Sequence, residues 1–215
     1  MKNILIYGDS NTWGFVPGSL DNANLSFKRY ARSQRYPGIL AEELGIDFHV
    51  IEEGLNSRTT VFEDPLSEGV NGKVYLPACL NSHAPLDLVV IMLGTNDLKQ
   101  YISSRPIEVA AGARQLVQTI KASNCGLGEK PEILLISPIL VHDMNNAWVE
   151  MFEDGEAKSM CLARLYQQVA EYENCHFLDA SKVANPSPKD GLHLDEKGHV
   201  ALAQALSKQV KEIFA

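Results

Sequence analysis

A serine, a histidine and an acid in this sequence stand at spacings that could support nucleophilic catalysis. Ser10 ends the tripeptide Gly8-Asp9-Ser10, which follows directly on a short apolar run. His193 is the one histidine in a loop-like segment with an acid close before it, namely Asp190. Serine attacks poorly unless a base removes its proton, and a carboxylate three residues before a histidine can bind one ring nitrogen and leave the other for the hydroxyl. The pattern predicts acyl transfer through a serine nucleophile, with Asp9 holding the turn by binding backbone N–H groups.

An acyl-transfer site also needs hydrogen-bond donors for the negative oxygen that forms during the reaction. The backbone N–H of Ser10 is one candidate, and the side-chain amide of Asn96, in the segment 94–97, is another. Each motif alone has a plainer interpretation. Gly-Asp-Ser and Asn-Asp both occur in ordinary turns, and Asp190 with its histidine could simply precede a helix that is capped by Asp195.

The elements that must position these residues alternate between apolar strands and amphipathic helices. Strands are predicted at residues 3–7, 48–52, 86–93, 132–137 and 176–178, and helices at 36–44, 106–123, 156–173 and 195–214. Such alternation is typical of a parallel sheet covered by helices on both faces, with sites outside the carboxyl ends of the strands. Ser10 and Asn96 follow the first and third strands at that end, so we expect them to lie close together.

Residues 59–83 form the least regular part of the chain, with several prolines and glycines. A stretch of about 25 residues is long for a loop, and long loops tend to be functional or to contain small elements of their own. We expect this segment to act as a lid, a wall of the substrate site or a contact between subunits. Residues 145–156 are a second candidate for a subunit contact.

Several further side chains could contribute to the site or simply pack the fold. Trp13 and Phe15 follow the candidate nucleophile, and either could line a substrate pocket or belong to the core. His142 follows the fourth strand at the same end of the sheet, which predicts a place in the substrate wall. Asp97 is interpreted as a turn residue, and His199 as a surface or capping residue of the last helix.

The composition limits the classes of partner. The chain has 215 residues and a formal charge of −8, which argues against nucleic acid or an anionic membrane surface. Its longest uninterrupted apolar run, residues 88–93, is too short to cross a bilayer. At this size we expect one domain over residues 1–215, acting on a small molecule.

The four cysteines are widely spaced and match no zinc-binding pattern: Cys79, Cys125, Cys161 and Cys175. This spacing argues against a structural zinc site, and acyl transfer through a serine nucleophile needs neither a metal nor an organic cofactor. The chain shows no signal-peptide pattern at its start, so we expect free thiols and a cytoplasmic location.

Three short motifs together resemble the GDSL/SGNH hydrolase superfamily. They are Gly8-Asp9-Ser10, Gly94-Thr95-Asn96-Asp97 and Asp190-x-x-His193, in the order of the superfamily and near its usual places. The resemblance covers nearly the whole chain. It implies an α/β fold, a three-layer α/β/α sandwich around a five-stranded parallel sheet in flavodoxin-like order. It also implies Ser10 as nucleophile, His193 as base and Asp190 as the residue that orients the base.

Within that superfamily the chain is most similar to the mycobacterial arylesterase/acyltransferase subgroup. The similarity lies in residues 51–60, 75–80 and 85–97. It implies an oxyanion hole formed by the backbone N–H of Ser10, a backbone N–H from the second motif and the Asn96 amide. The superfamily usually has glycine at that second position, where this chain has Ser57, so Gly54 is kept as an alternative donor.

The resemblance implies a serine esterase that hydrolyses short-acyl aryl or alkyl esters through an acyl-enzyme and can transfer the acyl group to alcohols. It also implies a homo-oligomer whose subunits help to shape the substrate channel. Deacetylation of acetylated sugars is the second interpretation. The third, from another class, is a flavodoxin-like binding module with an idle serine and histidine, in which Ser10 would resist covalent labelling.

Overall fold

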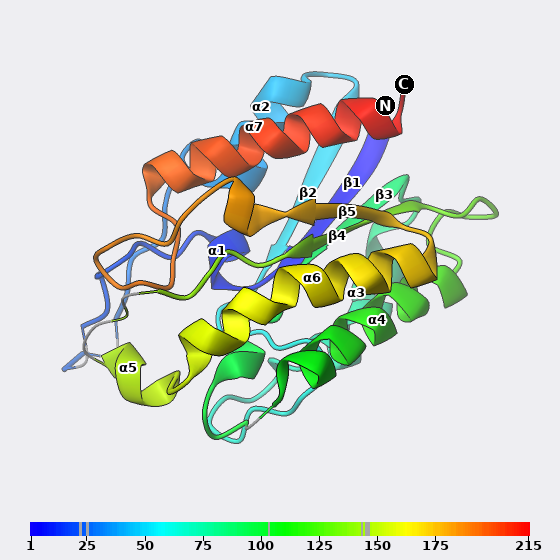
Figure 1. Cartoon of the computed structure of the whole chain (residues 1–215). Helices are drawn as coiled ribbons and strands as arrows, with labels where there is room; N and C mark the ends of the chain where they lie inside the picture. The colour runs from blue at the N-terminus through cyan, green and yellow to red at the C-terminus, as the bar shows by residue number, and fades with distance from the viewer. Residues whose placement is uncertain (22, 25, 103, 143, 145–146) are drawn as a thin grey trace.

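A five-stranded parallel sheet forms the centre of the computed structural model, which describes all residues except 22, 25, 103, 143, 145 and 146 (Figure 1). The strands are β1 (Lys2–Gly8), β2 (Phe48–Gly54), β3 (Leu88–Met92), β4 (Glu132–Ser137) and β5 (His176–Asp179). They pair in the order β2-β1-β3-β4-β5, and each pairing is parallel. This is the flavodoxin-like order, and the predicted fold class is confirmed.

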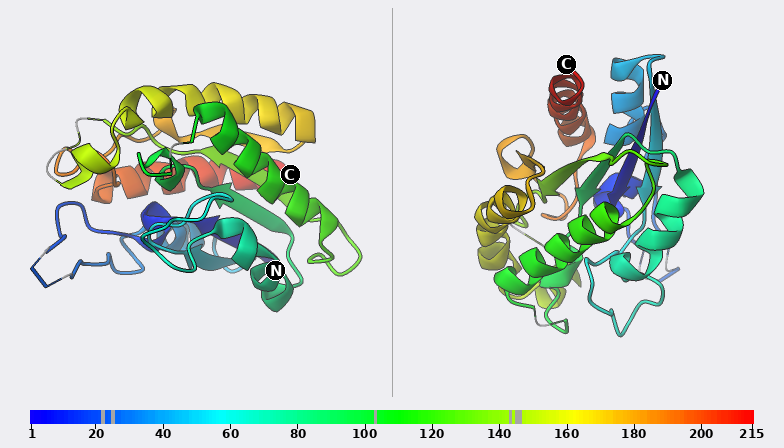
Figure 2. Two further views of the ribbon diagram at one scale, coloured as in Figure 1. Left: turned by 90° about the horizontal axis from the view of Figure 1, so that it is seen from below. Right: turned by 90° about the vertical axis from the view of Figure 1, so that its right-hand side faces the viewer.

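Helices cover both faces of the sheet, which gives three layers (Figures 1 and 2). One face carries α2 (Tyr36–Leu44) and α7 (Glu196–Ile213), and the other carries α3 (Gly72–His83), α4 (Pro106–Ala122) and α6 (Gly155–Glu173). The described residues also form four short elements: α1 (Ser10–Trp13), α5 (Ala147–Met151) and the 3-10 turns η1 (Asn96–Leu98) and η2 (Ala180–Lys182).

The central strands are apolar at successive positions because helices bury both of their sides. Leu5 and Tyr7 of β1 belong to the core under α3, α4 and α6, whereas Ile4 and Ile6 belong to the core under α2 and α7. All four side chains are fully buried. Successive side chains of a strand point to opposite faces, so a strand covered on both faces needs apolar residues throughout. This explains the unbroken apolar runs in the sequence.

The helix α3 lies inside segment 59–83, for which the sequence predicted an irregular stretch. Asn71 accepts a hydrogen bond from the backbone N–H of Lys73 and so caps the start of the helix. Gly72 begins the helix and Pro77 lies within it. Both residue types disfavour helices on their own, which is why the local pattern did not reveal α3. Residues 59–71 contain only turns, bends and single bridges.

Two further expectations concern membrane-spanning segments and the state of the cysteines. No helix in the described part of the chain is long and apolar enough to cross a membrane. All four cysteines are free thiols, as expected; Cys79 and Cys125 are buried, and Cys161 and Cys175 are half-buried.

Candidate active site

Ser10 lies at the carboxyl end of β1, in the first turn of α1. Gly8 ends the strand there, and a Cβ at this position would lie 1.9 Å from Oγ1 of Thr12, so a side chain would not fit the turn. Asp9 caps α1 by accepting a hydrogen bond from the backbone N–H of Asn11 at 3.0 Å, as predicted. The turn thus holds Ser10, which is 8% exposed, at the edge of a cavity.

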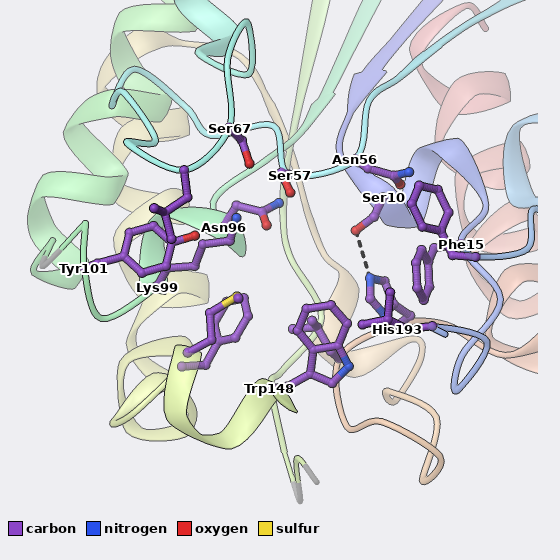
Figure 3. A pocket seen from close by; sticks show the side chains of 16 residues that line it. Ser10, Phe15, Asn56, Ser57, Ser67, Asn96, Lys99, Tyr101, Trp148 and His193 are labelled. Carbon is purple, nitrogen blue, oxygen red and sulfur yellow. Dashed lines mark hydrogen bonds between the residues drawn. The ribbon is translucent and has the colours of Figure 1, made fainter. Parts of the chain in front are cut away.

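Asp190 and His193 lie in the loop that leads into α7. Figure 3 shows the His193 ring facing the Ser10 hydroxyl. Oδ2 of Asp190 lies 2.8 Å from Nδ1 of His193, and Nε2 of His193 lies 3.0 Å from Oγ of Ser10. Oδ1 of Asp190 accepts hydrogen bonds from the backbone N–H groups of Leu192 and His193. The structure therefore brings the three predicted residues into one hydrogen-bonded line.

Asn11 ties the histidine loop to α1, a role that was not predicted from the sequence. Its Oδ1 accepts a hydrogen bond from the backbone N–H of Leu194 at 2.8 Å, and its Nδ2 donates to the carbonyl of Leu192 at 3.4 Å. His193 lies between these two partners, so Asn11 fixes the backbone of His193 relative to Ser10. The sequence offered only a polar residue next to the serine as a signal, because the partners lie at the other end of the chain.

Asn96 and Ser57 follow β3 and β2, and both line the cavity. Nδ2 of Asn96 donates to the backbone carbonyl of Arg58 at 3.1 Å. Ser57 has a φ of 64°, in the left-handed region that favours glycine. Gly54, the alternative donor, instead allows α1 to approach β2, since a Cβ there would lie 2.2 Å from the backbone nitrogen of Trp13. Gly54 is not among the described residues that line the cavity.

Of the two aromatic residues predicted near the nucleophile, one reaches the site. The ring of Phe15 stacks on the ring of His193 with 4.2 Å between centroids, and Trp148 meets His193 edge-on at 5.9 Å. Trp13 packs its ring against Phe27 instead, and it is not among the described residues that line the cavity. Both rings contact Phe27, but α1 ends at Gly14, which has a φ of 92°, and only Phe15 beyond it reaches His193.

The cavity has a volume of about 300 Å³. Its apolar lining consists of Phe15, Leu20, Phe27, Leu66, Trp148, Met151, Phe152 and Leu192, and its polar lining of Ser10, Asn56, Ser57, Ser67, Asn96, Lys99, Tyr101 and His193. Figure 3 shows Ser10 and His193 at one end, Lys99 and Tyr101 at the other, and Asn96 between them. A concave, largely apolar pocket with a few convergent polar groups is typical of small-molecule sites.

The family model for GDSL-like lipases and acylhydrolases matches residues 6–201 of the chain. The chain belongs to the GDSL-like lipase/acylhydrolase family. It is therefore a carboxylic ester hydrolase, as the sequence predicted, and the resemblance to the GDSL/SGNH superfamily is confirmed.

Solved structures of several esterases are similar to this chain over nearly their whole length. The aryl esterase of M. smegmatis is 42% identical over 99% of both chains, with a TM-score of 0.93. A carbohydrate acetylesterase from Sinorhizobium meliloti is 37% identical over 99% of this chain and 100% of its own, also with a TM-score of 0.93. A second carbohydrate acetylesterase family member from that organism is 39% identical, over 99% of this chain and 98% of its own, with a TM-score of 0.88. Comparison with curated protein sequences found no match.

In this GDSL family member the acid of the site is held ionised. Burial alone would raise the pKa of the Asp190 carboxyl, but hydrogen bonds from the His193 ring and from the backbone N–H groups of His193 and Leu192 bring it below its ordinary value. An ionised carboxylate only accepts hydrogen bonds, so Nδ1 of His193 donates to it. Nε2 is then free to accept the hydrogen bond of the Ser10 hydroxyl.

Arg58 holds the loop that carries Ser57, a role that its local sequence does not indicate. The side chain is buried, and its Nη1 donates to the backbone carbonyls of Gly8, at 2.9 Å, and of Glu53. Its guanidinium lies 4.1 Å from the ring centroid of Tyr7. Arg58 thus connects the ends of β1 and β2, and through its own carbonyl it also anchors Asn96.

Asp97 joins the β3 loop to the same segment, although the sequence suggested only a turn residue. Its carboxylate accepts the backbone N–H of Thr60 at 3.0 Å and also the Thr60 hydroxyl. Burial raises the pKa of Asp97 to about 6, against the opposing effect of these hydrogen bonds. Burial likewise raises the pKa of Asp9 to about 6. The local sequence around Asp97 does not indicate this contact, because Thr60 lies 37 residues earlier in the chain.

Two histidines differ from their expected placement. His142, predicted in the substrate wall, has an exposed side chain whose Nδ1 lies 2.8 Å from Oε1 of Glu156, and it is not among the described residues that line the cavity. His199, predicted at the surface, is fully buried between α7 and α2, where its Nδ1 accepts the backbone N–H of Tyr36. Burial lowers the pKa of His199 to about 4.

One group of potential metal ligands lies away from the cavity lining. Atoms of Glu53, Cys79 and His83 approach within 4.8 Å of one another. Nε2 of His83 already lies 2.8 Å from Oε1 of Glu53, and burial raises the pKa of the Cys79 thiol to about 12. Since metals bind the thiolate rather than the thiol, we assign no metal to this group.

Proposed function

We propose that the protein is a serine esterase in which Ser10 attacks the ester carbonyl while Nε2 of His193 takes the proton of the hydroxyl. The observation that carries the proposal is the line from Asp190 through His193 to Ser10, with distances of 2.8 and 3.0 Å. Asp190 keeps the imidazole in the required tautomer and stabilises the imidazolium that forms. His193 then protonates the leaving alcohol, and water or another alcohol resolves the acyl-enzyme.

The proposed oxyanion hole consists of the backbone N–H groups of Ser10 and Ser57 and the side-chain amide of Asn96. All three residues line the cavity. The amide nitrogen of Asn96 carries two protons and donates one hydrogen bond to the carbonyl of Arg58. The other N–H is available to a substrate oxygen, and a donor that is already held in place loses little energy to reorganisation during the reaction.

Short-acyl aryl and alkyl esters are the proposed substrates, with acyl transfer to alcohols as a second activity. A volume of about 300 Å³ is at the small end of ligand pockets, and the aromatic lining suits an aryl group. The similarity to an aryl esterase, that of M. smegmatis, supports aryl esters among these substrates.

The first experiment follows the hydrolysis of p-nitrophenyl esters, from acetate to decanoate, by the wild type and by Ser10→Ala. We expect the fastest hydrolysis with acetate or butanoate and a loss of about a thousandfold or more in Ser10→Ala. The control is Ser82→Ala, because among the described residues the Ser82 hydroxyl bonds only to a carbonyl of its own helix, α3. Comparable activity in Ser10→Ala and Ser82→Ala would contradict the proposal, and rates that keep rising to decanoate would contradict the short-acyl preference.

Deacetylation of acetylated sugars is a second candidate function. It is favoured by the two carbohydrate acetylesterases that are 37% and 39% identical to this chain over nearly its full length. Acetate release from acetylated xylose and from phenyl acetate, measured at equal concentrations, distinguishes the two candidates. A clearly faster release from the sugar would favour this second function over the first.

The cytoplasm is the proposed location. Its support is the presence of four free thiols, which persist in a reducing compartment. Recovery of the esterase outside the cytoplasmic fraction of its cells would contradict this location.

A further inference from the structure

The end of the cavity away from His193 carries a buried ion pair that the proposed chemistry does not use. Lys99 follows η1, lines the cavity and is only 3% exposed. Its Nζ lies 2.8 Å from Oδ2 of Asp64, whose side chain is fully buried. The hydroxyl of Tyr101, also in the lining, donates to the same oxygen at 3.2 Å.

The two partners of this pair differ in how completely they are hydrogen-bonded. Asp64 uses both oxygens, because its Oδ1 also accepts the backbone N–H of Leu66 at 2.8 Å. The ammonium of Lys99 has three N–H donors, and within the described part of the chain only Asp64 accepts from it. A buried donor without a partner costs free energy. An acceptor atom supplied by a ligand in the cavity would remove that cost.

The direction of the ester in the cavity follows from the proposed function, on which this inference rests. His193 must reach the oxygen of the leaving alcohol, so the alcohol part lies beside His193. The acyl chain leaves the carbonyl carbon in another direction. The cavity extends away from His193, past Asn96, to Lys99 and Tyr101 (Figure 3), and the acyl chain therefore points toward Lys99.

We propose that Lys99 determines acyl specificity by donating a hydrogen bond to an oxygen atom within the acyl chain. The preferred substrates are then esters of short alkoxy or hydroxy acids, rather than esters of alkanoic acids of equal length. An alkyl chain at this end would cover the remaining N–H groups of Lys99 and could accept no hydrogen bond from them. Because Asp64 balances the charge of Lys99, the site suits a neutral oxygen better than a second carboxylate.

The experiment compares pairs of p-nitrophenyl esters with acyl chains of equal length. The pairs are methoxyacetate with butanoate, and 3-methoxypropanoate with pentanoate. Each kcat/KM is divided by the rate constant for hydroxide-catalysed hydrolysis of the same ester, which corrects for the intrinsic reactivity. We expect the wild type to prefer the ether in at least one pair by about tenfold or more, as a hydrogen bond to a charged donor allows. A corrected ratio of one or less in both pairs would overturn the proposal.

A double variant tests whether Lys99 is the cause. Lys99→Met removes the donors and leaves an unbranched apolar side chain one atom shorter, and Asp64→Asn, made together with it, avoids a buried unpaired carboxylate. We expect the ether preference to fall about tenfold in this variant, mainly through faster hydrolysis of the alkanoates. Lys2→Met is the matched control, since Lys2 forms an ion pair of the same 2.8 Å length with Asp87, outside the cavity lining.

The outcomes separate this inference from the proposed function. An unchanged ratio in the double variant would overturn the role of Lys99 while leaving Ser10-dependent hydrolysis intact. Hydrolysis that does not depend on Ser10 would instead remove the proposed function. The wild-type ratios decide the substrate preference even if the double variant does not fold.

Discussion

Ser57 is a residue whose backbone conformation is costly for its side chain. Its φ of 64° lies in the left-handed region, where Cβ crowds the following carbonyl at a cost of about 1–2 kcal/mol. The residue beside it, Arg58, is buried and bonded to the ends of two strands, and its carbonyl binds Asn96. These contacts hold the loop in one conformation. We therefore interpret the strain at Ser57 as imposed by the geometry of the proposed oxyanion hole.

Substitutions of Ser57 distinguish its backbone from its hydroxyl. We expect Ser57→Ala to keep kcat/KM within about threefold, because the proposed donor is the backbone N–H. Ser57→Gly should also remain active and should gain up to about 1 kcal/mol in free energy of unfolding, since relief of strain is partly offset by the flexibility of glycine. Kinetics and urea unfolding measure the two effects.

The matched control is Leu127→Gly, at another residue with positive φ, 52°, outside the cavity lining. It should gain stability with no change in kcat/KM. A loss of about a hundredfold in Ser57→Ala would mean that the hydroxyl, rather than the backbone N–H, acts on the substrate.

At the scale of elements, the site is a junction of loops that follow β1, β2, β3 and β5 on the side of the sheet where the strands have their carboxyl ends. The rule that ligands bind at the carboxyl ends of parallel strands predicted that Ser10 and Asn96 lie close together, and the serine–histidine–acid pattern predicted that His193 joins them. The contacts that set their distances were not predictable from local pattern. Asn11 with Leu194, and Asp97 with Thr60, join residues that the chain separates widely.

Asp97 gives this junction a specific pH dependence. Its pKa is about 6 in the folded protein and about 4 in an unfolded chain. As the pH falls below about 6, the folded state therefore binds the proton first, and the contribution of Asp97 to stability rises. Relative to Asp97→Asn, the wild type should gain about 2–3 kcal/mol in free energy of unfolding between pH 7.5 and pH 4. Urea unfolding of both proteins over this range measures the difference. Parallel stability curves would contradict a buried carboxyl that titrates in this window.

At the scale of the whole molecule, the sequence was sufficient to predict a strand or helix wherever apolar residues recur at the spacing of a buried face. It predicted the five strands and the four long helices outside segment 59–83, because each buries a continuous face. It failed at α3, where Gly72 and Pro77 weaken the local helical preference and packing against the sheet decides instead. It also failed for His199, because the sequence does not show which face of α7 turns toward α2.

We propose that the protein forms a homo-oligomer, with contacts in segments 59–83 and 145–156. Residues 145 and 146 lie outside the described part of the chain. Within the rest of these segments, Leu66, Val74 and Val149 are exposed apolar residues, and exposed apolar surface favours association. Light scattering at micromolar concentration should give a mass above that of one chain, and the mass of a single chain would contradict the proposal.

A charge in the proposed contact should weaken the assembly. We expect Val74→Glu, on α3, to shift the mass toward smaller species, because an unpaired charge would be buried in the contact. Met160→Glu, at a similarly exposed position on α6, is the matched control and should leave the mass unchanged. An equal effect of both substitutions would argue against a contact through α3.

The most direct test of the proposed nucleophile is covalent labelling by a serine-reactive p-nitrophenyl phosphonate, followed by mass spectrometry of the intact chain and its peptides. The line from Asp190 through His193 to Ser10 predicts one phosphonyl group per chain, attached to Ser10, and no label in Ser10→Ala. An unlabelled wild type, or a label on another residue with Ser10 unmodified, would contradict the account and favour a binding module with an idle serine.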